Sequence, residues 1–207
     1  MADAEHPQIY LVSPPEIELS RFPKLLAACL DTAPVACFRL ALSSKDETAL
    51  SKAGDACREV CHARDVAIVI DTHVQLAERL GLDGVHLPDG SKSVRKARKA
   101  LGGDAIVGSH CAQSRHDGMT AGEADADYVC FGPTAPTALG DGAHAERELF
   151  EWWSEVIEVP VVAEGGLGAE QIAALAPYVD FFALGDEVWS AAAPEAALSE
   201  IAARLKG

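Results

Sequence analysis

The feature that most constrains the fold is a regular alternation of short apolar runs with longer stretches of helical periodicity. The runs are about five residues long and β-branched or aromatic, as expected for parallel strands buried on both faces. The runs are Ile9–Val12, Val35–Leu40, Ala67–Ile70, Gly84–Leu87, Ala105–Gly108, Tyr128–Phe131, Val159–Ala163 and Phe181–Leu184. The helical stretches are Ser20–Asp31, Asp46–Arg64, His73–Leu80, Ser91–Leu101, Ser114–Ala124, Leu149–Ile157, Ala169–Ala176 and Pro194–Leu205.

This alternation predicts an α/β fold with a parallel sheet and right-handed crossovers. Eight strand–helix units favour closure into a single (β/α)8 TIM barrel. The alternative is an open doubly wound sheet, which usually carries a glycine fingerprint after its first strand. Ser13-Pro14-Pro15 follows the first strand here, so that fingerprint is missing. No linker divides the chain, and we expect one domain spanning residues 1–207.

Charge and hydropathy exclude several classes of partner. The chain has 32 acidic and 17 basic residues and a formal charge of −15, which disfavours binding to nucleic acid or to an anionic membrane. No apolar run reaches the length of a membrane span, and the first residues do not read as a signal peptide. Its 6 cysteines lie mostly in apolar, periodic segments, as buried thiols do in a reducing compartment. We therefore expect a cytoplasmic protein.

In a barrel of this kind, functional groups follow the carboxyl ends of the strands. Ser13 and Gly185 lie at the ends of the first and eighth strands. Arg39 lies inside an apolar run, where a guanidinium is costly unless it is paired or solvated. It is either a bidentate clamp for an anion or part of a structural salt bridge, for example to Asp71 on the next strand, and both roles are compatible.

Asp71 itself either binds a metal or polar ligand, or caps the following helix. His110 ends the fifth strand and is the better acid–base candidate, whereas His86 lies mid-strand and is expected to be a satisfied core histidine. The segment Pro133–Ala145 is rich in small residues, glycine and proline, and is typical of a mobile lid over the barrel mouth.

Gly165-Gly166 precedes a predicted helix, and Gly185 would form the opposite wall of the same loop site. The loops after strands seven and eight are the usual phosphate site of these barrels, where free backbone N–H groups meet the anion. Glu164 and Asp186 flank this place. Their carboxylates would repel a phosphate unless they point away or are paired.

At these strand ends the sequence resembles the thiamine phosphate synthase and thiazole tautomerase superfamily. The matching segments follow the superfamily order along most of the chain. They are Tyr10-Leu11-Val12-Ser13, Ile68-Val69-Ile70-Asp71, Asp83-Gly84-Val85-His86-Leu87, Ala126-Asp127-Tyr128-Val129, Phe131-Gly132-Pro133, Pro136-Thr137, and Pro160-Val161-Val162-Ala163 with Gly165-Gly166.

The resemblance implies a barrel with Mg²⁺ that joins a hydroxymethylpyrimidine pyrophosphate to a thiazole phosphate in thiamine biosynthesis. Pyrophosphate leaves first to give a stabilised carbocation, which the thiazole nitrogen attacks. Together with the strand-end analysis, it assigns catalytic roles to Arg39, Asp71 and His110. The substrate-binding residues expected are Ser13, Thr137, Gly165, Gly166 and Gly185, and the metal ligands are Asp71 and Asp89.

Several superfamily positions differ in this chain. The Asn-Asp pair after the third strand is Asp71-Thr72, and the lysine two residues after the arginine is Ala41. The segment 133–145 contains no lysine, and the phosphate-contacting serine after the last strand is Asp186. These changes remove positive charge and metal ligands from a site that must hold pyrophosphate.

Three functions are therefore compatible with the sequence. The first is a transferase of the thiamine phosphate synthase type with a modified site. The second is a paralogue without transferase activity that binds or isomerises a related small heterocycle, and the third is a non-enzymatic binding protein. The expected partner is a phosphorylated small heterocycle. The apolar pair Trp152-Trp153 marks either a homodimer face or, as we favour, a helix packed on the barrel.

Overall fold

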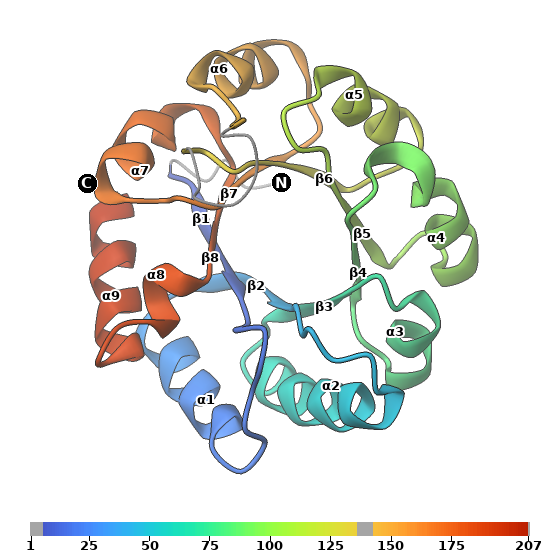
Figure 1. Cartoon of the computed structure of the whole chain (residues 1–207), viewed down its shortest axis with the longest axis vertical. Helices are drawn as coiled ribbons and strands as arrows, with labels where there is room; N and C mark the ends of the chain where they lie inside the picture. Colours follow the sequence, from blue (N-terminus) through green and yellow to red (C-terminus); the bar gives the residue numbers. More distant parts are fainter. Residues whose placement is uncertain (1–5, 136–142, 207) are drawn as a thin grey trace.

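The computed structural model describes residues 6–135 and 143–206, and within them eight parallel strands close into a barrel in chain order, with β8 paired to β1. The helices form a ring outside the strands (Figure 1). The strands are β1 Gln8–Val12, β2 Val35–Leu40, β3 Ala67–Asp71, β4 Gly84–Leu87, β5 Ile106–His110, β6 Tyr128–Phe131, β7 Val161–Glu164 and β8 Phe181–Leu184. The helices are α1 Phe22–Thr32, α2 Glu47–His62, α3 Val74–Leu80, α4 Val94–Leu101, α5 Arg115–Glu123, α6 Arg147–Val156, α7 Ala169–Leu175, α8 Asp186–Trp189 and α9 Pro194–Leu205. The predicted (β/α)8 TIM barrel is confirmed.

The differences from the predicted boundaries have local causes. The strand β5 extends to His110, two residues further than its apolar run, because Ser109 and His110 continue the pairing with β6. The helix α4 begins at Val94 and not at Ser91, because a 3₁₀ turn over Gly90–Lys92 comes first. Ser114 caps α5, since its hydroxyl accepts a hydrogen bond from the Asp117 amide.

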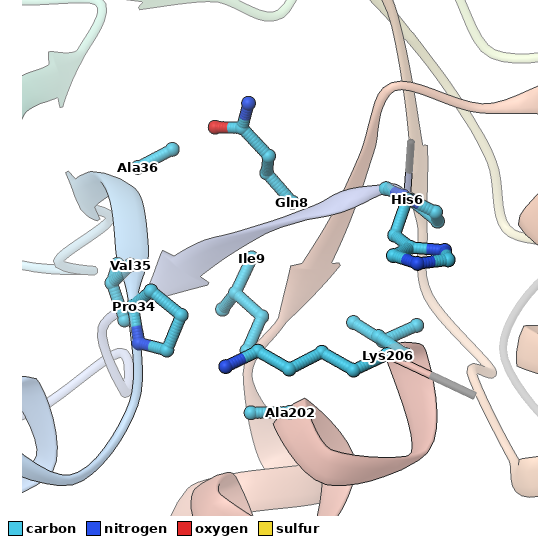
Figure 2. A pocket seen from close by; sticks show the side chains of 10 residues that line it. His6, Gln8, Ile9, Pro34, Val35, Ala36, Ala202 and Lys206 are labelled. Atoms are coloured by element: carbon cyan, nitrogen blue, oxygen red, sulfur yellow. The ribbon is translucent and has the colours of Figure 1, made fainter. Parts of the chain in front are cut away.

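The amino-terminal end of the barrel carries an apolar cavity of about 390 Å³ (Figure 2). Its lining comes from the segment leading into β1, the start of β2 and the end of α9; it includes His6, Ile9, Val35 and Lys206. This end of a barrel serves mainly stability, whereas chemistry belongs at the carboxyl ends of the strands. The functional site is therefore expected at the opposite end of the barrel.

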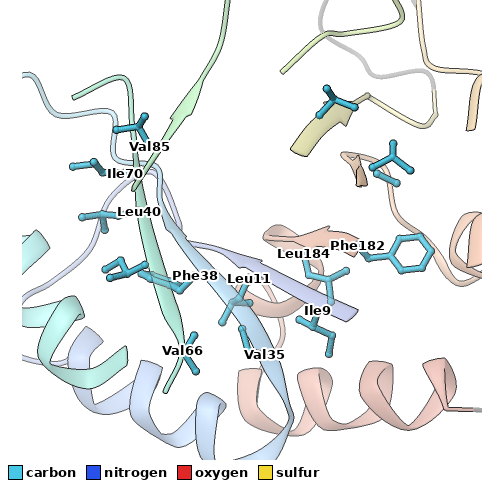
Figure 3. Packing of buried hydrophobic residues seen from close by; sticks show 14 of the residues in the cluster. Ile9, Leu11, Val35, Phe38, Leu40, Val66, Ile70, Val85, Phe182 and Leu184 are labelled. Carbon is cyan, nitrogen blue, oxygen red and sulfur yellow. The ribbon is translucent and has the colours of Figure 1, made fainter. Parts of the chain in front are cut away.

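The core has two layers because successive strand residues point to opposite sides of the sheet. The outward layer packs the strands against the helices and contains Ile9, Leu11, Phe38, Ile70 and Leu184 (Figure 3). The inward layer fills the lumen, and its apolar members are Tyr10, Val12, Cys37, Val69, Tyr128, Cys130, Val162 and Ala183. This division fixes which strand residues face the lumen.

Of the two tryptophans on α6, Trp153 packs in the core and Trp152 is only partly buried. Trp153 is 1% exposed, its indole N–H donates to the carbonyl of Val159, and its ring meets Phe131 edge-on. Trp152 lies on the outer side with the guanidinium of Arg115 above its ring. In the part of the chain that the structure describes, no helix has the length and apolar character that crossing a bilayer requires.

Candidate active site

Polar side chains gather at the carboxyl end of the lumen. Arg39, Asp71 and Glu164 are in phase with inward-facing apolar residues of their own strands, which are Cys37, Val69 and Val162. The register pairs Arg39 with Val69, Asp71 with His86, His110 with Cys130, and Glu164 with Ala183. Two of the residues expected from the sequence to be catalytic, Arg39 and Asp71, lie within ion-pair distance of each other. The third, His110, joins them through Glu164.

Arg39 forms a buried ion pair with Glu164, across 125 residues of sequence. Both terminal nitrogens of Arg39 donate to the Glu164 carboxylate, and Nη1 lies 3.1 Å from Oε2. The Nε of Arg39 lies 3.5 Å from Oδ1 of Asp71, which is the neighbour proposed from the sequence. The Arg39 side chain is 7% exposed, so its charge is matched mainly inside the protein. The guanidinium therefore already holds a carboxylate in its bidentate fork.

This pairing gives the two carboxyl groups beside Arg39, those of Glu164 and Asp71, different pKa values. Burial alone would raise the pKa of Glu164, but the Arg39 charge and its hydrogen bonds lower it to about 2. At Asp71, burial is the largest effect and raises the pKa to about 6, against the opposing charge of Arg39. Glu164 is therefore the fixed anion of the cluster, and Asp71 is the carboxyl group that titrates.

Asp71→Asn is expected to stabilise the protein more at pH 7.5 than at pH 4.5. The pKa of Asp71 rises from 3.8 to about 6 on folding, so ionising this group costs stability. That cost is absent below about pH 4 and complete above about pH 6. Because the side chain is 36% exposed, we expect a gain on the order of 1 kcal/mol at pH 7.5. Melting temperatures of both proteins across this range measure it.

The control for this pH series is Asp186→Asn, because Asp186 is an exposed carboxylate near the same end of the barrel. Its melting temperature is measured at the same pH values, and a change that both variants share would not be assigned to the burial of Asp71. An Asp71→Asn protein that is less stable than the parent at pH 7.5 would show that the Arg39 ion pair outweighs the cost of burial.

His86 belongs to a buried hydrogen-bonded chain across the lumen. Its Nδ1 lies 2.9 Å from the Tyr128 hydroxyl, which lies 2.6 Å from the Tyr10 hydroxyl. Gly108 makes room for this chain, since a Cβ there would lie 1.9 Å from the Tyr128 ring. Burial lowers the pKa of His86 well below its usual value, so the ring is neutral. The expectation of a satisfied core histidine agrees with this arrangement.

His110 faces the same space from β5. Its Nδ1 lies 3.9 Å from Oε2 of Glu164, and its ring centre lies 6.5 Å from that of His86. Burial is the main cause that lowers the pKa of His110, although Glu164 acts in the opposite direction. A neutral imidazole at pH 7 accepts a proton or hydrogen-bonds a heterocycle without adding charge.

Two groups of residues are relevant to a metal. Among the described residues, His86, His110 and Glu164 offer ligand atoms within 4.8 Å of one another, but Mg²⁺ prefers oxygen ligands and this set offers two imidazoles. The expected ligands Asp71 and Asp89 each carry a buried Oδ1 that has no hydrogen-bond partner within the described part of the chain. The Asp71 oxygen is also the one that faces Nε of Arg39 at 3.5 Å, whereas Asp89 has no such cation beside its Oδ1 among the interactions of the described residues. Carboxylate oxygens without a hydrogen bond fit a hard cation, so the aspartates suit Mg²⁺ better than the histidines.

Asp89 also lines a cavity of about 650 Å³ beside α3 and α4. Its Oδ2 accepts a hydrogen bond from the Ser93 hydroxyl at 2.6 Å, which fixes the carboxylate. Lys45 and Lys96 line the same cavity and supply positive charge near that aspartate. Sequence reasoning missed both lysines because they lie outside the positions where the superfamily carries its own.

The glycine loop after β7 has a backbone conformation that favours glycine and packs closely against the β6 loop. Gly165 and Gly166 have φ angles of 78° and 71°, in the left-handed region that favours glycine. The Thr134 amide and hydroxyl both donate to the Gly165 carbonyl at 2.8 Å. The β6 and β7 loops are thereby fastened together, with Gly166 facing Ala135 so closely that a Cβ would lie 3.0 Å from it.

Glu187, which the sequence did not single out, connects this loop to the end of β8. Its carboxylate accepts hydrogen bonds from the Leu167 amide at 3.2 Å and the Gly185 amide at 3.0 Å. Its neighbour Asp186 is exposed. The expected phosphate loops after strands seven and eight are therefore bridged by a carboxylate of the chain itself.

The remaining predicted residues divide into two cases. The Ser13 hydroxyl accepts a hydrogen bond from the Ala41 amide at 2.9 Å and donates to the Pro14 carbonyl, so it fastens the ends of β1 and β2. Thr137, and with it most of the expected lid, lies outside the described residues. The substrate-binding roles of Ser13, Thr137, Gly165, Gly166 and Gly185 stay predictions.

Comparison with known proteins identifies the relatives of this chain. The family described as thiamine monophosphate synthase matches residues 9–188. A thiamine-phosphate synthase from Rhodospirillum centenum is 39% identical over 203 residues, covering 97% of this chain and 98% of that protein. The thiamine-phosphate synthase from Erythrobacter litoralis is also 39% identical, over 98% of this chain and its own full length.

Solved structures agree on the fold. A thiamine phosphate pyrophosphorylase from Pyrococcus furiosus superposes with a TM-score of 0.83 over 97% of both chains, at 20% identity. The predicted superfamily resemblance is confirmed by the sequence matches, which extend over nearly the whole barrel. The chain belongs to the thiamine monophosphate synthase family.

Proposed function

We propose that the protein joins a hydroxymethylpyrimidine pyrophosphate to a thiazole phosphate, in a thiamine phosphate synthase site with altered charges. The observation that carries this proposal is the family match over residues 9–188, because these residues include all the polar side chains described above at the carboxyl end of the lumen. The cluster brings Arg39, Asp71, His110 and Glu164 together at the end of the barrel where such enzymes act.

Arg39 and the cavity lysines would hold the pyrophosphate. The bidentate fork of the Arg39 guanidinium suits phosphate oxygens as well as a carboxylate. The incoming anion therefore competes with Glu164 for this guanidinium. Lys45 and Lys96 replace part of the positive charge that Ala41 and the segment 133–145 do not supply. Asp71 and Asp89 would hold Mg²⁺, which neutralises the charge of the leaving pyrophosphate when bound.

Glu164 would give the lumen a negative charge beside Arg39 and His110, where the proposed function places the pyrimidine. Against the cost of burial, the Arg39 charge and hydrogen bonds lower its pKa to about 2 and keep it ionised as long as it stays beside that guanidinium. When pyrophosphate leaves, a positive charge develops on the pyrimidine methylene, and a buried carboxylate stabilises it. His110 stays neutral in this role and hydrogen-bonds the pyrimidine, because burial lowers its pKa. The thiazole phosphate would lie on the loops at Gly165, Gly166 and Gly185.

The test is an assay with both substrates and Mg²⁺ that follows thiamine phosphate and pyrophosphate together. We expect the two products in equal amounts, with no turnover when either substrate or Mg²⁺ is omitted. Turnover that is unaffected by Lys45→Ala together with Lys96→Ala would remove these lysines from the pyrophosphate site. No product at any substrate concentration would contradict the transferase.

A second candidate function follows from the Arg39–Glu164 pair. Because Arg39 already has a carboxylate partner, the lumen also suits a neutral or cationic heterocycle that brings no phosphate. A paralogue of this kind would bind or isomerise its ligand without transferase activity. If the protein has this function, the unphosphorylated heterocycles should raise its melting temperature. The pyrimidine pyrophosphate should leave the melting temperature of the same preparation unchanged.

A further inference from the structure

The loops after β7 and β8 approach each other where the proposed function places the thiazole phosphate. Leu167 belongs to the first loop and Gly185 to the second, and their amides come within hydrogen-bond distance of one shared group. Backbone amides from these two loops are the usual donors to a phosphate in such barrels. The shared group in this chain is the carboxylate of Glu187.

We propose that Glu187 is a specificity-determining residue that competes with the substrate phosphate for these two amides. The inference rests on the proposed function, since it concerns the thiazole phosphate end of the same site. The two carboxylate oxygens take one amide each, at 3.2 Å from Leu167 and 3.0 Å from Gly185. A phosphate that bound both amides would have to displace this carboxylate or bind beside it.

The position of Glu187 makes the competition local and reversible. It lies in the short helix α8, directly after β8 and against α9 (Figure 1). The residue is only partly buried, and the next residue, Val188, anchors the helix in the core with no exposed surface. A rotation of the Glu187 side chain therefore frees both amides without moving the backbone that carries them.

The surrounding charges strengthen the effect. Asp186 is exposed beside Glu187, and the net charge of the chain is −15. No cation contacts the Glu187 carboxylate among the interactions of the described residues, so its two hydrogen-bond partners are uncharged amides. A phosphate approaching these loops meets like charge, which lowers its affinity relative to an unphosphorylated thiazole alcohol.

The experiment measures the dissociation constants of thiazole phosphate and of its unphosphorylated alcohol by calorimetry. The proteins are the full chain, Glu187→Ala, Glu187→Gln and the control Asp186→Ala. Two charge-assisted hydrogen bonds are at stake, so we expect Glu187→Ala to bind thiazole phosphate roughly tenfold to a hundredfold more tightly. Glu187→Gln should gain less, because an amide oxygen still accepts one of the hydrogen bonds. The alcohol should bind all four proteins equally.

Three outcomes would overturn the proposal. The first is equal affinity of the parent and Glu187→Ala for thiazole phosphate, and the second is no binding to Glu187→Ala, because the freed amides should then accept the anion. The third is an equal gain in Asp186→Ala, which would assign the effect to general charge. Product formation in the transferase assay judges the proposed function separately, so either idea can fail alone.

Discussion

Glu164→Ala is expected to lower the free energy of unfolding by about 3–5 kcal/mol, because it leaves the buried Arg39 guanidinium without its main counter-charge. Arg39 is 7% exposed and has the more distant Asp71 as its other ion-pair partner among the described residues. In a domain of this size, each kcal/mol corresponds to roughly 2–4 °C in melting temperature. Denaturant unfolding at pH 7 measures the loss directly.

The unfolding measurement is made at pH 7 because Glu164 is fully ionised there in the folded protein. Its pKa is lowered on folding from 4.5 to about 2, chiefly because the Arg39 charge and hydrogen bonds overcome the cost of burial. The contribution to stability is therefore complete above about pH 4.5 and disappears as the pH falls toward 2. The difference between parent and variant should therefore be constant from about pH 7 to 8, above the range in which Asp71 titrates, because burial, helped by Glu164, raises the Asp71 pKa to about 6.

Two further variants isolate the cause of the loss. Glu164→Gln keeps the shape of the side chain and removes its charge, so most of the destabilisation should persist. Asp186→Ala removes an exposed carboxylate from the neighbouring loop and should change stability by at most about 0.5 kcal/mol. If Glu164→Ala lost no more than Asp186→Ala, the ion pair would contribute nothing to stability.

The fold could be predicted because each strand carries its own local signal. Six consecutive residues from Val35 to Leu40 read as one buried strand, and the structure has a strand with those same bounds. Where polar residues continue a strand, as Ser109 and His110 do in β5, the apolar pattern ends too early. Pairing with the neighbouring strand decides such boundaries, and a single sequence does not contain that information.

The site was predictable only in part, because its partners are far apart in the chain. The apolar run around Arg39 indicates that its guanidinium needs a partner, and the sequence offers Asp71 on the next strand, which agrees with the ion pair at 3.5 Å. The stronger partner, Glu164, lies on β7, across the lumen. The period-two pattern could have indicated it, since Glu164 is in phase with the inward-facing Val162. Glu187 gave no such signal, because its contacts are with backbone amides.

Arg39→Met combined with Glu164→Leu should separate the structural role of this ion pair from its functional role. Replacing both members of a buried pair with apolar side chains is often neutral or stabilising, so the double variant should unfold within about 1–2 kcal/mol of the parent protein. Transferase turnover should nevertheless fall by about 100-fold or more, because the pyrophosphate clamp and the carboxylate facing the developing cation are both removed. Steady-state kinetics and denaturant unfolding of one preparation give both quantities.

The kinetic parameters of the double variant decide between the candidate functions. If Arg39 clamps the pyrophosphate, the apparent dissociation constant of the pyrimidine pyrophosphate should rise together with the loss of turnover. A stable double variant that keeps both turnover and affinity would show that the pair only fills the lumen, and the transferase role of Arg39 would be abandoned. A different result would favour the paralogue. In that case neither protein binds the pyrimidine pyrophosphate, and the double variant alone loses affinity for the unphosphorylated heterocycle. The lumen would then recognise the ring and not the anion.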